Sequence, residues 1–126
     1  MKTLSLSFLW IVAITGGYAQ SVADSSSYFV VTYTTGSAWN AEKSAQDQLY
    51  FKEHSAHLVK LRKEKIIVAG ARYGEKGMII IRAGSLRSAM TSIFSDVALK
   101  NNLFVAQIEP LQVFYPGCLE LLPSQK

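Results

Sequence analysis

Residues 46–64 constrain the fold most, because they have the pattern of a single amphipathic helix. At about 100° per residue, one face of this helix comprises Tyr50, Phe51, Leu58 and Leu61. His54 falls in the middle of that face and His57 on its edge, while lysines and glutamates occupy the opposite side. We therefore expect the helix to lie on a sheet with at least one imidazole among apolar side chains. That imidazole is either a satisfied core residue or a titratable group held in a cleft.

Residues 1–19 have the layout of a secretory signal peptide. Lys2 gives the positive start, residues 4–14 form an apolar run, and Gly17 with Ala19 fits the small-x-small rule for cleavage after Ala19. The run is shorter than the roughly 20 apolar residues that a membrane-spanning helix needs. We therefore expect an exported protein, periplasmic or extracellular, with no stable membrane anchor after cleavage. An N-terminal anchor that is never cut is the alternative.

The composition argues against several partners and cofactors. The net charge is only +4, and no basic cluster is interleaved with aromatic residues, so we expect no nucleic-acid partner. Cys118 is the only cysteine, which rules out an intrachain disulfide and a cysteine-based metal site. His54, His57 and Asp96 could together bind a metal. The sequence offers no cluster of further ligands around them, and we expect neither a metal nor a cofactor.

The pattern of periodicities predicts an α+β domain with a ferredoxin-like βαββαβ order. Strands are expected at 28–34, 66–70, 78–82 and 103–109, the last continuing toward Phe114. One helix should begin near Glu42 or Ser44 and end near Glu64, and a second should follow the N-cap Ser85 and fade around Ser95. This order gives a four-stranded antiparallel sheet with two helices on one face. The domain spans 28–120, between a disordered lead-in at 20–27 and a tail at 121–126.

The predicted strands carry few charges on either face. Two helices can cover only one face of the sheet, so the other face is left apolar and open. An apolar face of this kind usually packs against a partner. We expect a homodimer through this sheet face, in which two sheets form a shared α/β barrel.

Several short motifs occur together in one order along the chain. They are Tyr28-Phe-Val-Val31, Gly36-Ser-Ala-Trp-Asn40, a helical histidine, Ile66-Ile-Val-Ala-Gly70, Ser85, Asp96 and Ile108-Glu-Pro110. From Tyr28 to about Glu120 the chain thereby resembles the YCII-related domains, small proteins of the dimeric ferredoxin-like α/β-barrel type.

The resemblance implies a functional pair made by a histidine of the first helix and an aspartate after the second helix. Asp96 matches the aspartate, although the family's Asp-Pro is Asp96-Val97 here. The family's His-Leu dipeptide is found at His57-Leu58. The number of residues from Trp39 to the histidine, and the place of His54 in the middle of the apolar helix face, favour His54. Both histidines therefore remain candidates.

A carboxylate that accepts a hydrogen bond from one imidazole nitrogen fixes the tautomer and raises the basicity of the other nitrogen. The first functional hypothesis is accordingly a lyase or isomerase that moves a proton on a small organic substrate. Trp39, Tyr33 and Tyr73 are candidates for the walls of its pocket. The alternatives are a non-catalytic small-ligand-binding module and a structural domain on the same fold.

Export with cleavage after Ala19 is directly testable, because the apolar run at 4–14 and the small residues after it define one cleavage site. Mass spectrometry of the exported protein should give a chain that begins at Gln20. A mature chain that still begins at Met1 would contradict the prediction.

Overall fold

The computed structural model describes residues 26–119. The signal peptide expected at 1–19, nearly all of the lead-in and the tail at 121–126 lie outside the described residues. The elements are β1 (Ser27–Thr35), the 3₁₀ turn η1 (Ala45–Asp47), α1 (Phe51–Lys63), β2 (Ile67–Tyr73), β3 (Lys76–Ala83), α2 (Leu86–Phe94), α3 (Val97–Lys100) and β4 (Phe104–Leu111). The predicted order of strands and long helices is present, with η1 and α3 as additions.

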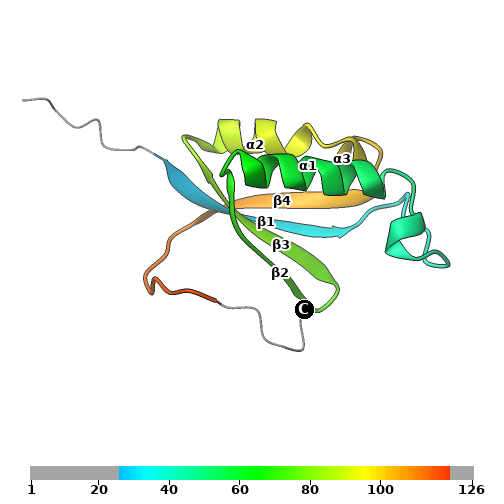
Figure 1. The fold of residues 1–126 in the computed structure, drawn as a ribbon, viewed down its shortest axis with the longest axis horizontal. Coiled ribbons are helices and arrows are strands. Elements are labelled where there is room, and N and C mark those ends of the chain that lie inside the picture. The colour runs from blue at the N-terminus through cyan, green and yellow to red at the C-terminus, as the bar shows by residue number, and fades with distance from the viewer. Residues whose placement is uncertain (1–25, 120–126) are drawn as a thin grey trace, which may run out of the picture.

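The four strands form one antiparallel sheet in the order β2-β3-β1-β4. This α+β architecture is compatible with a ferredoxin-like fold. The helices lie together over one face of the sheet (Figure 1). Pro110 sits in β4, where its missing N–H is tolerated because β4 is an edge strand.

The core lies between this face and the helices. Along β1 the side chains of Phe29, Val31 and Tyr33 are buried, whereas the residues between them are only half-buried. This period of two is what a strand with one covered face requires. The buried residues of the other elements in the same cluster are Leu61, Ile79, Ile81, Ala89 and Ile93.

The first helix begins later than the sequence predicts. Tyr50 has a φ of 68° in the left-handed region, which a right-handed helix of L-residues cannot contain, so α1 starts at Phe51. Ser44 does not cap a long helix; its hydroxyl donates to the Asp47 carboxylate at 2.6 Å. The expectation of a helix from Glu42 or Ser44 is therefore wrong by about two turns.

The hairpin between β2 and β3 is longer than predicted. The strands expected at 66–70 and 78–82 left residues 71–77 as a connection, but β2 continues to Tyr73 and β3 begins at Lys76. Gly74 and Glu75 alone form the turn, and Gly74 has the positive φ of 54° that tight hairpin turns demand. Residue 72 is thereby an ordinary strand position opposite Gly77.

The loop after β1 is fastened to the start of β4. The Gly36 amide donates to the Leu103 carbonyl at 2.8 Å, and the Ala38 amide donates to the Asn102 carbonyl at 3.0 Å. A Cβ at Gly36 would lie 2.1 Å from the Asn102 carbonyl oxygen, which belongs to the backbone and cannot swing away. Only glycine permits this approach, which also places Trp39 beside Phe104.

Gly36→Ala should therefore destabilise the protein by roughly 1–3 kcal/mol, the usual cost of forcing extra atoms into a packed site. Gly84→Ala is the matched control, because a Cβ at Gly84 meets nothing within 4 Å. Urea unfolding of the two variants measures the difference. Equal free energies of unfolding would contradict the close approach at Gly36.

Candidate functional site

His54 and Asp96 form a buried pair. The His54 Nδ1 donates to the Asp96 Oδ2 at 2.5 Å, and the two residues are 8% and 1% exposed. The second carboxylate oxygen, Oδ1, accepts from the Ala98 amide at 2.9 Å, so Asp96 is also the N-cap of α3. Because each carboxylate oxygen has its own donor, the orientation of the carboxylate is fixed. Of the two candidate histidines, His54 is thus the one that contacts Asp96.

The imidazole is held on its remaining sides by aromatic rings. The centroid of Phe104 lies 4.7 Å from that of His54, and the Tyr33 ring meets the imidazole edge-on at 5.3 Å. His54 is in the first turn of α1, and its amide donates to the Tyr50 carbonyl at 3.0 Å. The left-handed turn at Tyr50 thus sets where α1 starts and where the imidazole stands.

Burial raises the pKa of Asp96, but the opposing effects are larger together. The hydrogen bond from His54, the hydrogen bond from the Ala98 amide and the positive charges of His54 and His57 lower this pKa below its ordinary value. Asp96 is therefore a carboxylate at neutral pH. Because the Asp96 carboxylate accepts from Nδ1–H, the neutral form of the imidazole has its lone pair on Nε2.

Tyr33 contributes a buried hydroxyl beside this pair. Burial, and secondly the negative charge of Asp96, raise the pKa of Tyr33 well above its ordinary value, so the hydroxyl stays protonated. Its oxygen is sealed from solvent and has no hydrogen-bond partner among residues 26–119. Unsatisfied buried hydroxyls are rare in folded proteins. Tyr33 is thus a donor without an acceptor, next to the candidate base.

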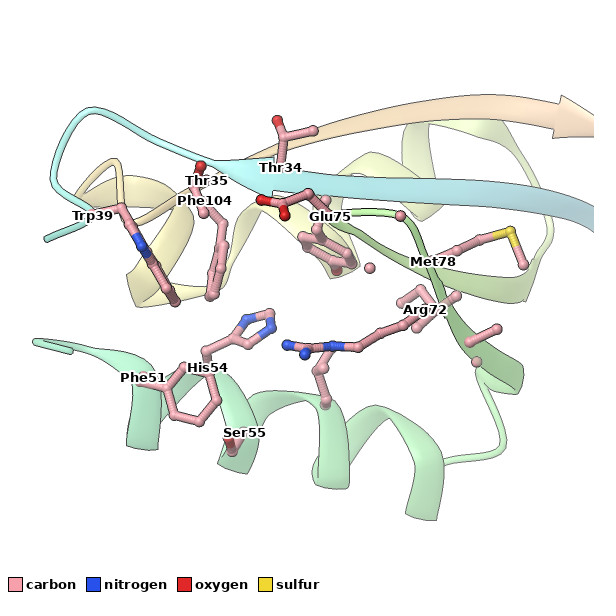
Figure 2. Close-up of a pocket in the computed structure, with 17 residues that line it drawn as sticks. Thr34, Thr35, Trp39, Phe51, His54, Ser55, Arg72, Glu75, Met78 and Phe104 are labelled. Carbon is pink, nitrogen blue, oxygen red and sulfur yellow. The ribbon is translucent and has the colours of Figure 1, made fainter. Parts of the chain in front are cut away.

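A cavity of about 700 Å³ opens beside His54, between α1 and the β2–β3 hairpin (Figure 2). Its lining includes Tyr33, Trp39, Phe51, His54, Ser55, Leu58, Arg72, Glu75 and Phe104. The Nε2 of His54 has no hydrogen-bond partner in the described part of the chain and is not sealed from solvent as the Tyr33 oxygen is. The volume is within the usual range for small-molecule sites.

Two of the three aromatic residues proposed as pocket walls line the cavity, Tyr33 and Trp39. Tyr73 does not. It pairs with Lys76 in the hairpin, and since successive side chains of a strand alternate, it faces away from the side on which Arg72 lies. Tyr73 is outside the lining because residues 71–73 continue β2, which fixes the face on which its side chain lies.

His57 stands away from the cavity. Its Nε2 donates to the Ser92 carbonyl at 2.9 Å and so ties α1 to the end of α2. His57 is therefore not part of the cavity lining, although it was kept as a candidate for the functional histidine on the edge of the helix face. Of the two histidines, only His54 meets both Asp96 and the cavity.

Most lining residues were not among the sequence candidates, and four of them bring aromatic or charged groups to the cavity: Phe51, Arg72, Glu75 and Phe104. Phe51 was assigned to the apolar helix face that contains His54, and Phe104 lies two positions before Ala106, which pairs with Tyr33. The helical period around His54 and the strand period in β4 could therefore have identified both residues. Arg72 and Glu75 could not be identified in this way, because the strand expected from the sequence ended at residue 70, which missed both the strand position of Arg72 and the tight turn that contains Glu75.

No known family model, curated protein or solved structure matches this chain. Within residues 26–119, no helix is long and apolar enough to cross a membrane. The same residues contain no group of three or more His, Cys, Asp or Glu side chains that could hold a metal ion.

The lowered pKa of Asp96 predicts a pH-dependent contribution to stability. A carboxyl group whose pKa is lower in the folded state stabilises the fold above its unfolded pKa, which is ordinarily 3.8, and this contribution is lost as the pH falls through the folded value. Asp96→Asn should lower the free energy of unfolding by roughly 1–3 kcal/mol at pH 7, as expected for a poorly paired buried group. The gap from wild type should shrink below about pH 4.

Urea unfolding between pH 7 and pH 3 measures this gap. Asp47→Asn is the control, because Asp47 is an exposed carboxylate whose change should stay within about 0.5 kcal/mol. A gap between wild type and Asp96→Asn that does not change with pH would contradict the ionised pair.

Proposed function

We propose that this protein is a small enzyme of lyase or isomerase type, in which the Nε2 of His54 is the general base for proton transfer on a small organic substrate. One observation carries the proposal: a buried His54–Asp96 pair presents the unpartnered nitrogen of the imidazole to a cavity of about 700 Å³. Asp96 orients the ring and stabilises the imidazolium that forms when Nε2 takes a proton.

The surrounding residues suit proton transfer to and from carbon. The aromatic rings of Tyr33 and Phe104 give the base largely apolar surroundings, and the Tyr33 hydroxyl next to it stays protonated and is a hydrogen-bond donor without a partner among residues 26–119. The imidazolium can return the proton at another carbon, which is isomerisation, or a neighbouring group can depart, which is elimination. A positioned general base of this kind contributes about 10²- to 10⁴-fold to the rate.

We also propose that the chain is an exported relative of the YCII-related domains. The order of elements and the pairing of a first-helix histidine with the aspartate after α2 support the relationship. The apolar run at 4–14 supports export. A non-catalytic binding module on the same fold is the alternative, and turnover separates the two.

The same relationship includes a homodimer that packs through the open face of the sheet into an α/β barrel. Support comes from the side chains on that face, which alternate with the buried ones along β1 and β3. Those of Val30, Thr32 and Ile80 are half-buried, and Val105 remains 49% exposed in the single chain. Covering them would remove apolar surface from water, which is the main favourable term in association.

The proton-transfer hypothesis predicts exchange of carbon-bound hydrogen for solvent deuterium. Wild-type protein should incorporate deuterium into members of a panel of small carbon acids, followed by ¹H NMR in D₂O. His54→Gln should abolish the exchange, and Asp96→Asn should slow it by about 10²-fold or more, because the base loses its orienting partner. His57→Gln is the matched control and should change the rate little.

Circular dichroism melts establish that each variant is folded. Exchange by folded His54→Gln at the wild-type rate would refute the assignment of the base. If panel compounds bind but none exchanges in wild type, the protein is a binding module and not an enzyme.

The dimer hypothesis predicts that a charge on the open sheet face separates the subunits. Val105→Glu should yield monomers in light scattering at micromolar concentration, because an unpaired carboxylate would be buried in an apolar interface. Val59→Glu on α1 is the matched control, since Val59 has a similar exposure of 52% on the helix side. A wild-type protein that is monomeric under the same conditions would eliminate the hypothesis.

A further inference from the structure

We infer that the cavity binds a small organic anion, with a carboxylate held by Arg72 and an unsaturated or aromatic body against Trp39 and Phe104. This inference names the substrate class, and it rests on the proposed function only in taking this cavity as the substrate site. Arg72 would be the residue that selects acids over neutral analogues.

The strand register directs Arg72 into the cavity. Arg72 pairs with Gly77 of β3, and Gly77 in turn pairs with Tyr33 of β1, so all three positions share the face on which the helices lie. Gly77 has no side chain to fill the space next to Arg72. Figure 2 shows the guanidinium reaching from β2 across the cavity toward His54.

The guanidinium is not neutralised within the described part of the chain. The one ion pair among residues 26–119 is that between His54 and Asp96, so no carboxylate lies within 4 Å of the Arg72 nitrogens there. Among the described residues that line the cavity, Glu75 is the one that carries a carboxylate. Asp96 is engaged by His54 and by the Ala98 amide. A free, planar guanidinium fork matches the two oxygens of a carboxylate.

The other end of the cavity is aromatic. The Trp39 and Phe104 rings lie 5.6 Å apart, and the Phe51 ring lies 6.4 Å from that of Phe104. Phe104 also contacts His54, whose Nε2 therefore stands between the cationic end and the aromatic wall. Flat π-systems pack on such rings with favourable geometry. A molecule anchored at both ends thus presents the carbons near its carboxylate to the candidate base.

Paired acids and amides test the inference, because a primary amide has nearly the shape of a carboxylate but no charge. The probes are 4-fluorobenzoate, 4-fluorophenylacetate and 4-fluorocinnamate, each with its primary amide, titrated against the full chain and followed by ¹⁹F NMR. At least one acid should bind wild type about tenfold more tightly than its amide, the usual gain from charge-assisted hydrogen bonds. Added salt should weaken binding of the acid and leave the amide unchanged.

Three variants and one matched control assign the effect to Arg72. Arg72→Gln should weaken binding of the acid about tenfold and leave amide binding unchanged, and Arg72→Lys should restore part of the loss because it keeps the charge without the fork. Glu75→Gln should strengthen binding of the acid by removing a like charge. Arg62→Gln is the control, because Arg62 is an exposed arginine outside this cavity, and it should leave both affinities unchanged.

The inference is overturned if no acid binds more tightly than its amide, or if Arg62→Gln weakens acid binding as much as Arg72→Gln. Its failure is distinct from failure of the proposed function. Arg72-dependent acid binding without deuterium exchange would refute the enzyme hypothesis and support the anion site. Exchange on neutral compounds, with no acid that binds in an Arg72-dependent way, would support the enzyme and refute the anion site.

Discussion

The bond between His54 and Asp96 is the interaction on which the helical layer depends. It joins the first turn of α1 to the corner between α2 and α3, two segments that are 42 residues apart in the chain. Burying both polar groups is costly unless each is satisfied. Nδ1 and both carboxylate oxygens have partners, because Asp96 also caps α3. The pair therefore fixes the position of α1 relative to the rest of the helices as well as the orientation of the imidazole.

The surroundings of the pair are less completely satisfied. The Tyr33 hydroxyl has no partner among the described residues, and the Nε2 of His54 has none either. A leftover buried donor costs roughly 1–3 kcal/mol, and a fold that needed only a stable core would gain from a phenylalanine at this position. Tyr33 and His54, the two residues with an unpartnered polar group, both line one cavity. A core histidine with all of its hydrogen bonds made would not have this arrangement.

Periodicity predicted most of the fold, because the strands and helices here obey it. The alternation in β1, the N-cap at Ser85 and the inward place of His54 could all be read from the sequence. The capping box that Ser85 forms with Ser88 lies where the pattern required it. The resemblance implied a contact between Asp96 and a histidine of the first helix, and the apolar face of that helix favoured His54. Such a contact requires only that α1 and α2 lie on the same side of the sheet.

Backbone conformation was the part that the sequence did not disclose. Nothing in the residue types requires the left-handed turn at Tyr50, since its bulky side chain disfavours a positive φ. Residues 71–77 contain two glycines and three charges, which is typical of a loop, yet cross-strand pairing carries the hairpin through all but Gly74 and Glu75. Tertiary pairing overrides local propensity here. That extension adds Arg72 to the site and removes Tyr73 from it.

The pleat of the sheet keeps the two proposed surfaces separate. In β4, Phe104 faces the cavity and Val105 the open side, and in β2 the same relation holds between Arg72 and Tyr73. Since neighbouring residues of a strand point to opposite faces, the two sheet residues whose rings meet His54, Tyr33 and Phe104, lie on the face away from the proposed dimer contact. A one-residue register shift in either strand would exchange the two sets. The same register that buries the core therefore puts the side chains proposed to bind the ligand and those proposed to form the dimer contact on opposite faces of one sheet.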